Sequence, residues 1–209
     1  MRIAVPRGRL NDPTWTWLQQ AGLALAAPAG RQLWTQAGSV DAVEVRGRDM
    51  PSLLTAGVVD AAIVGRDVLE EAGLPLVLVR PLDFGACRLV AAAPPDTVLA
   101  PGRHWRVASR YPRITRKWME ARGLTGEVVT MSGAVEAAPW LGLADAVVDV
   151  VETGATLAAN GLVALETVMR STATLSASPK SARAVQRWIQ EALPERRERG
   201  MDPRAVGVS

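Results

Sequence analysis

The chain has 209 residues, of which 48% are hydrophobic and 22% are charged, and its formal net charge at pH 7 is +3. This length and composition suit one large or two small globular domains and exclude an intrinsically disordered protein. No apolar run approaches the roughly 20 residues of a transmembrane helix and no charged-then-apolar leader opens the sequence, so we expect a cytoplasmic protein without a membrane partner.

Strands and helices alternate in the first part of the sequence. Residues 3–5 predict a strand, which is followed by the basic turn Pro6-Arg7-Gly8-Arg9 and an amphipathic helix over 10–21. A basic turn beyond the carboxyl end of a strand is a good anion site, although ordinary solvated loops have the same composition. The further elements predicted here are strands at 32–34, 42–45, 60–64 and 76–82, a helix at 50–56 with Asp49 as its cap, and a helix at 66–71 that closes at Gly73.

A second set of strands and helices follows and points to a second lobe. It comprises predicted strands at 88–93, 105–108, 127–130, 146–151, 165–169 and 173–176, and helices at 112–122, 135–141 and 180–193. The last helix should return to the first lobe, whereas the charged tail after Pro194 is expected to be mobile or packed on a partner. We therefore expect an α/β fold of the type II periplasmic-binding-protein architecture. Lobe I would comprise residues 1–88 and 175–209, lobe II residues 89–174, and two crossing strands would join them.

The strand predicted at 146–151 runs directly into the polar turn Thr153-Gly154-Ala155-Thr156. The strand is mostly valine and apolar on both faces, as parallel strands usually are. The turn offers two hydroxyls, a glycine that tolerates positive φ, and consecutive backbone N–H groups, a set that can cradle a phosphate. Asp149 and Glu152 lie just upstream, where carboxylates would repel a phosphate unless a ribose diol or a metal ion lies between them. The stretch thus indicates a ribose 5-phosphate site, with ordinary helix capping by the two threonines as the alternative.

Other chemistries find little support in the sequence. Cys87 is the only cysteine and His104 the only histidine, which excludes an internal disulfide and argues against a structural zinc site. His104 lies in a predicted loop, so we expect neither Ser-His-Asp nor Cys-His catalysis, and Cys87 is expected to be a small buried residue. The positive charge fits either a nucleic-acid binder or an enzyme with polyphosphate substrates. The arginines are scattered near predicted strand ends, which favours separate anion sites over a nucleic-acid surface.

A long spacing pattern carries a family resemblance. The residues Glu136, Gly142, Ala144, Asp149, Thr153-Gly154 and Thr156-Leu157 resemble the phosphoribosyl-diphosphate (PRPP) signature of the ATP phosphoribosyltransferases. Residues 3–10, 45–46, 65–71 and 82–88 look like further blocks of that family in the same order, and the chain is identified as a member. It departs from the pattern at Ser132 and Ala134, where the family usually has Asn and Ser, so no side-chain role is carried over to those two positions.

The resemblance implies an enzyme that transfers the phosphoribosyl group of PRPP to ATP, giving phosphoribosyl-ATP and pyrophosphate in the first step of histidine biosynthesis. The residues implied for PRPP binding are Asp149, Glu152, Thr153, Gly154, Ala155 and Thr156, those for ATP binding are Arg9, Gly65 and Asp67, and the arginines expected to meet the polyphosphates are Arg9, Arg31 and Arg46. Mg²⁺ would be held by substrate phosphates, so no protein metal site is expected.

The resemblance also implies partners. After residue 176 the sequence leaves room for one helix and a short tail, which resembles the short form of the family. That form implies a homodimer and a hetero-oligomer with a regulatory subunit similar to histidyl-tRNA synthetase. Two alternatives stay open from the residues alone: a bilobed module that binds a small molecule without catalysis, because a fold does not fix a function, and a PRPP transferase with another acceptor.

Overall fold

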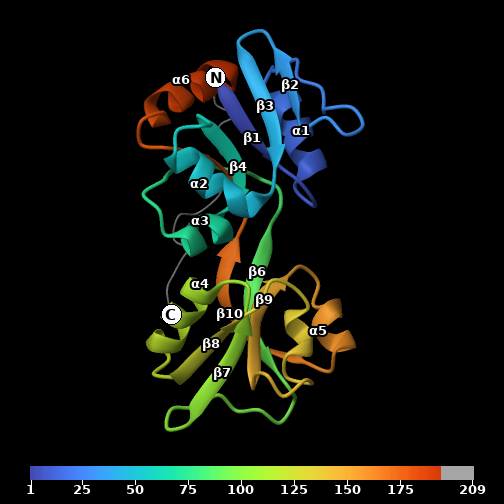
Figure 1. The fold of residues 1–209 in the computed structure, drawn as a ribbon, viewed down its shortest axis with the longest axis vertical. Coiled ribbons are helices and arrows are strands. Elements are labelled where there is room, and N and C mark those ends of the chain that lie inside the picture. The colour runs from blue at the N-terminus through green and yellow to red at the C-terminus, as the bar shows by residue number, and fades with distance from the viewer. Residues whose placement is uncertain (194–209) are drawn as a thin grey trace.

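The computed structural model describes residues 1–193, which form two α/β lobes stacked along the long axis of the molecule (Figure 1). Lobe I is built on a six-stranded sheet of order β2-β3-β1-β4-β11-β5. Its strands are β1 (Arg2–Pro6), β2 (Trp34–Ala37), β3 (Val40–Val45), β4 (Ala61–Gly65), β5 (Val77–Pro81) and β11 (Ala173–Ala177). β1 runs parallel to β3 and β4, whereas β11 lies antiparallel between β4 and β5.

Helices cover both faces of the lobe I sheet. They are α1 (Asn11–Gln20), η1 (Gly47–Asp49), α2 (Met50–Thr55), α3 (Arg66–Ala72) and α6 (Ala182–Ala192). Alternate residues of a strand point to opposite faces, so Ile3 packs with α1 and α6 while Ala4 packs with α2. The return of α6 to lobe I is confirmed, since Val185 and Ile189 belong to the same core as Ile3.

Lobe II is built on a five-stranded sheet of order β10-β6-β9-β7-β8. Its elements are β6 (Cys87–Ala93), β7 (His104–Ser109), α4 (Pro112–Ala121), β8 (Thr125–Thr130), η2 (Val135–Ala137), β9 (Ala146–Val151), α5 (Ala155–Ala159) and β10 (Val163–Ser171). The bounds predicted for β9 are confirmed. It is apolar on both faces because Val148 packs in the core under α4 while Val147 packs in the core under α5. It pairs parallel with β7 but antiparallel with β6.

Two crossings join the lobes and lie beside each other. The chain leaves lobe I between β5 and β6 and returns between β10 and β11 at Thr172. The Thr172 Oγ1 atom lies 2.9 Å from the carbonyl oxygen of Leu82 and 2.8 Å from that of Phe84, which ties the two crossings together. The sequence places the lobe boundaries after residues 88 and 174, whereas β6 begins at Cys87 in the second sheet and β11 begins at Ala173 in the first.

Several local predictions were wrong. The helix predicted at 135–141 is only the short turn η2, because Pro139 lacks an N–H group and Gly142 has a φ of 69°. The strand predicted at 32–34 lies at Trp34–Ala37, and His104 begins β7 instead of lying in a loop. Asp49 occupies the N-cap position of α2, but its side chain makes no capping hydrogen bond.

The prediction for the tail after Pro194 falls outside the described residues. Within residues 1–193, no helix combines the length and the apolar character needed to cross a membrane.

Candidate active site

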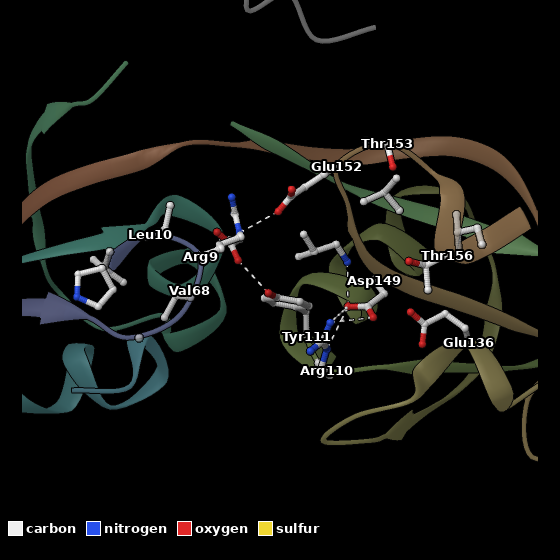
Figure 2. A pocket seen from close by; sticks show the side chains of 18 of the residues that line it. Arg9, Leu10, Val68, Arg110, Tyr111, Glu136, Asp149, Glu152, Thr153 and Thr156 are labelled. Atoms are coloured by element: carbon white, nitrogen blue, oxygen red, sulfur yellow. Dashed lines mark hydrogen bonds and ion pairs between the residues drawn. The ribbon is translucent and has the colours of Figure 1, made fainter. Parts of the chain in front are cut away.

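A cavity of about 550 Å³ lies between the lobes (Figure 2). Two turns of lobe I line it, the one after β1 with Arg9 and the one after β4 with Gly65 and Asp67. Lobe II contributes the turn between β7 and α4 and the turn between β9 and α5. The carboxyl ends of parallel strands therefore face one another across the cavity, which is where open α/β sheets bind their ligands.

The turn after β9 forms part of the cavity wall. Gly154 has a φ of +87°, a left-handed conformation that residues with a side chain rarely adopt, and it directly precedes α5. Thr153, Gly154 and Thr156 line the cavity, whereas Ala155 does not. The Thr153 hydroxyl accepts a hydrogen bond of 3.4 Å from the backbone N–H of Ala155, so the capping interpretation also applies to this threonine.

Asp149 is the buried anion of the site. Its side chain is 3% exposed and is held by Arg110, whose Nε lies 3.1 Å from Oδ1 and whose Nη2 lies 2.8 and 2.9 Å from Oδ1 and Oδ2. The backbone N–H of Val150 donates a further bond to Oδ1 at 2.8 Å. Burial lowers the pKa of Arg110, but the Asp149 carboxylate more than offsets this, so the net shift is upward and the guanidinium keeps its charge.

The pairing of β7 with β9 explains why Arg110 reaches Asp149. The two strands are parallel neighbours in which Ser109 lies opposite Val148. The residues that follow, Arg110 and Asp149, therefore lie at the same edge of the sheet. The Ser109 hydroxyl donates to the carbonyl oxygen of Val148 at 2.6 Å and accepts from the N–H of Tyr111 at 2.9 Å. These bonds fix the start of the β7–α4 turn against β9.

A second buried carboxylate, Asp67, lies on the lobe I wall and is 5% exposed. Its Oδ2 accepts a 2.8 Å hydrogen bond from the Tyr111 hydroxyl of lobe II, and its Oδ1 accepts a 2.6 Å bond from the Ser171 hydroxyl. Burial and the charge of Asp67 raise the pKa of Tyr111 well above its ordinary value, so the phenol stays protonated. Burial, followed by the charge of Asp67, also raises the pKa of the Cys87 thiol, which agrees with the buried residue expected from the sequence.

Arg9 spans the cavity between the lobes (Figure 2). Its Nε lies 3.2 Å from Oε1 of Glu152, while its other nitrogens donate to the carbonyl oxygen of Gly85 at 3.3 Å and to Sγ of Cys87 at 3.2 Å. The side chains of Arg9 and Glu152 are 40% and 55% exposed, so this ion pair adds little stability. A polyanion that enters the cavity can therefore displace Glu152 as the partner of the Arg9 guanidinium at a small cost in free energy.

The cavity brings together most of the residues predicted for the site, which come from both lobes. Those that line it are Arg9, Gly65, Asp67, Asp149, Glu152, Thr153, Gly154 and Thr156. Arg31 and Arg46 are exposed and lie outside the lining, as does Ala155. The roles of all these residues toward PRPP and ATP stay predictions.

The sequence indicates no site role for Arg110 or Tyr111, since its pattern predicts only that a helix starts at Tyr111-Pro112. The available signal was their position just beyond the carboxyl end of the strand predicted at 105–108.

Comparisons with known proteins agree with this arrangement. A family model described as ATP phosphoribosyltransferase matches residues 46–196. The ATP phosphoribosyltransferase of Deinococcus deserti is 43% identical over 176 residues, covering 84% of this chain and 81% of the relative. That of Thermococcus gammatolerans is 41% identical over 177 residues, covering 84% and 86%.

Solved structures give the same result for the fold. The ATP phosphoribosyl transferase (HisG:HisZ) complex from Thermotoga maritima matches with a TM-score of 0.80 and 28% identity, covering 93% of this chain and 98% of that one. The periplasmic aliphatic sulphonate binding protein SsuA from Escherichia coli matches with a TM-score of 0.60 and 17% identity, covering 93% and 70%. The second likeness concerns the fold alone and confirms the periplasmic-binding-protein architecture expected for the two lobes. With the family model and the sequence relatives in agreement over most of its length, the chain belongs to the ATP phosphoribosyltransferase family.

Proposed function

We propose that this chain transfers the phosphoribosyl group of PRPP to ATP, giving phosphoribosyl-ATP and pyrophosphate in the first step of histidine biosynthesis. One observation supports the proposal independently of family membership. The phosphate turn with Gly154 and Asp149, and the lobe I residues Arg9 and Asp67, come from distant parts of the sequence yet line one cavity. Such a cavity offers two opposed walls for the two substrates of a transfer reaction.

The lobe II wall suits the ribose 5-phosphate end of PRPP. The turn at Thr153-Gly154-Ala155-Thr156 would receive the 5-phosphate, and the carboxylates of Asp149 and Glu152 would accept hydrogen bonds from the ribose hydroxyls. Both carboxylates are paired with arginines, Asp149 with Arg110 and Glu152 with Arg9. The pairing keeps two negative charges compatible with a phosphate-bearing ligand.

The reaction needs charge stabilisation more than it needs a base. A ring nitrogen of adenine attacks the anomeric carbon with its own lone pair, a C–N bond forms, and the C–O bond breaks with its electron pair leaving on pyrophosphate. Positive charge develops at the anomeric carbon, which the Asp149 carboxylate would face, while Arg9 would neutralise charge on the departing pyrophosphate. Arg31 and Arg46 stay predicted contacts that the lining of the cavity does not include.

Mg²⁺ is implied by the resemblance to the family. Within residues 1–193 no group of three His, Cys, Asp or Glu side chains is placed to hold a metal ion, and the paired carboxylates of the cavity do not form a cage. These residues do not fit a protein-held ion. In our proposal Mg²⁺ therefore arrives on the substrate phosphates, and no step of the reaction is assigned to a protein-bound metal.

The direct test is to incubate the protein with ATP, PRPP and Mg²⁺. We expect pyrophosphate release together with the altered ultraviolet absorbance of a modified adenine. Binding without turnover would instead favour the small-molecule module, and turnover only with another nucleophile would favour a different PRPP transferase. A control reaction without ATP separates transfer from simple hydrolysis of PRPP.

We further propose that the chain works as a homodimer within a hetero-oligomer that includes a separate regulatory subunit. The solved complex from Thermotoga maritima is named as a HisG:HisZ complex and matches 93% of this chain, which supports a partner of that kind.

We expect histidine to leave the activity of the isolated chain unchanged and to inhibit it once the partner is added. Feedback is a coupling between two sites and needs the effector site to be present. Titrating histidine with and without the partner measures this. Strong inhibition of the isolated chain would place the effector site on this chain.

A further inference from the structure

Three segments from different parts of the fold meet at the Asp67 carboxylate. Asp67 lies in the first turn of α3 in lobe I, Tyr111 immediately precedes α4 in lobe II, and Ser171 ends β10 at the crossing. The Tyr111 hydroxyl donates to Oδ2 at 2.8 Å and the Ser171 hydroxyl donates to Oδ1 at 2.6 Å, while the backbone N–H of Asp67 donates to Ser171 Oγ at 3.0 Å. Each oxygen of this buried carboxylate therefore accepts a hydrogen bond from a residue outside lobe I's own sheet.

Tyr111 is also the last of three consecutive residues whose side chains bond to other elements of the fold. Ser109 binds the carbonyl oxygen of Val148, Arg110 holds the Asp149 carboxylate, and Tyr111 crosses to Asp67. The segment 109–111 is thus a short rigid link between β9, which carries the candidate ribose site, and the wall of lobe I.

We propose that Tyr111 is a positioning residue for phosphoribosyl transfer. Through its bond to Asp67 it sets the separation of the two cavity walls, so that the anomeric carbon held beside Asp149 meets the nucleophile held by lobe I. The proposal rests on the proposed transfer reaction and adds a residue that acts through Asp67 rather than on the substrate. Proximity of this kind matters because small misplacements of reacting groups cost large factors in rate.

Gly65 supplies an independent reason to regard the Asp67 position as set by the surrounding structure. A Cβ atom built on Gly65 would lie closer to Asp67 Oδ1 than real Cβ atoms ever approach another atom. The glycine leaves the space for Oδ1, the carboxylate oxygen that Ser171 bonds, and this placement turns Oδ2 to Tyr111. Gly65→Ala should therefore push Asp67 away and weaken the Tyr111 bond without altering lobe II.

Other contacts hold the same segment of lobe II against lobe I. The Arg48 guanidinium donates to the carbonyl oxygen of Arg110 at 3.1 Å and lies 5.6 Å from the centre of the Tyr111 ring. The Glu71 carboxylate of α3 accepts from the N–H groups of Arg113 and Ile114 at 2.9 and 3.0 Å, capping α4 from the opposite lobe. These contacts should keep the interface between the lobes formed when only the phenol oxygen is removed. Tyr111→Phe therefore tests the bond to Asp67 by itself.

The first experiment compares Tyr111→Phe with Thr115→Val. Thr115 is a matched control because its hydroxyl lies buried in the first turn of α4, just after Tyr111, and has no hydrogen-bond partner within residues 1–193. We expect Tyr111→Phe to lower kcat about tenfold, the factor associated with a hydrogen bond to a charged group, while the Kd for PRPP alone changes less than twofold. Thr115→Val should leave both unchanged. An unaltered kcat in Tyr111→Phe would overturn the proposal, and so would a higher Kd for ATP alone with kcat preserved.

A double-mutant cycle separates positioning from direct contact with substrate. If Tyr111 acts through Asp67, adding Tyr111→Phe to Asp67→Ala should lower kcat no further than Asp67→Ala does by itself. Independent losses that multiply would show that the phenol serves the substrate directly, contrary to the proposal. Gly65→Ala, which leaves both partners in place, should reproduce the kcat loss of Tyr111→Phe.

The bond itself has a spectroscopic signature because Tyr111 is the only tyrosine in the sequence. Absorbance at about 295 nm, where phenolate absorbs, follows its ionisation as the pH rises, with Tyr111→Phe as the blank. The charged groups that face the phenol are Asp67, Arg48, Arg110 and, beyond them, Asp149. In the folded wild type we expect no ionisation near the ordinary tyrosine pKa of 10.0, and in Asp67→Ala we expect the pKa to move down toward it.

Ionisation near that ordinary value in the wild type would show that the bond to Asp67 does not form. This measurement needs no substrate, so it is separate from the fate of the proposed function, which fails if the wild type does not turn over ATP and PRPP.

Discussion

Gly154→Val is expected to lower the affinity for PRPP by about 5- to 150-fold, since each 1.4 kcal/mol of lost binding is a factor of ten and a strained backbone residue costs about 1–3 kcal/mol. Gly154 has a φ of +87°, which a β-branched residue adopts only with strain. A Cβ atom at this position would meet only Cγ1 of Val151, at 3.9 Å, so we expect the loss to come from the changed path of the turn. Equilibrium binding of PRPP measures the effect.

Gly154→Asn separates two explanations of that loss. Asparagine tolerates the left-handed conformation better than other residues with side chains, so it should keep the path of the turn. If PRPP affinity recovers with Asn, backbone conformation is what matters; if it stays low, the ligand needs the bare backbone. A Gly154→Val variant that binds PRPP normally would remove the turn from the site, and thermal denaturation checks that the fold is kept.

Asp149→Asn is expected to lower kcat/KM for PRPP by about one to two orders of magnitude, because charge-assisted hydrogen bonds are worth about 1.5–3 kcal/mol each. The amide keeps the shape of the carboxylate but removes the charge that Arg110 balances and that we propose to face the anomeric carbon. ATP binding measured alone should change much less, since the lobe I residues are untouched. An equal loss for both substrates would contradict the assignment of Asp149 to the ribose.

Arg110→Lys serves as the companion variant for Asp149. It keeps a positive charge beside the buried carboxylate but loses the forked geometry that reaches both oxygens. The carboxylate of Asp149 then keeps a positively charged partner, so we expect this variant to retain more PRPP affinity than Asp149→Asn. A larger loss in Arg110→Lys would assign the main contact to the guanidinium itself.

The sequence predicts best where local pattern and burial agree. The strand β9 is predicted to the residue because its valines face cores on both sides, and α3 closes at Gly73, whose φ of 60° suits a helix end. The helix predicted at 135–141 fails because its apolar residues are interrupted by Pro139, which local periodicity does not register. Apolar residues over a few positions cannot distinguish a helix from a turn packed on a sheet.

For the candidate site, the residues within one turn are easier to predict than those that meet across the fold. Thr153, Gly154 and Asp149 come from a single stretch whose chemistry is visible in the sequence. Tyr111 and its partner Asp67 are 44 positions apart, and nothing local marks the phenol as a donor to that carboxylate. Single arginines are the least predictable, as the placement of Arg31 and Arg46 outside the cavity lining illustrates.

The position of β11 between β4 and β5 has a consequence for how the protein is made. Lobe II is continuous from β6 to β10, so all of its strands are available once residue 171 has been synthesised. The lobe I sheet lacks an inner strand until β11 follows, and until then β4 has an open edge while β5 has no neighbour. Open edges are prone to pair with other chains, and pairing between distant segments is slow. Synthesis from the N-terminus therefore leaves the first lobe to complete last, and a ribosome that stalls before Ala173 holds a chain with an aggregation-prone edge.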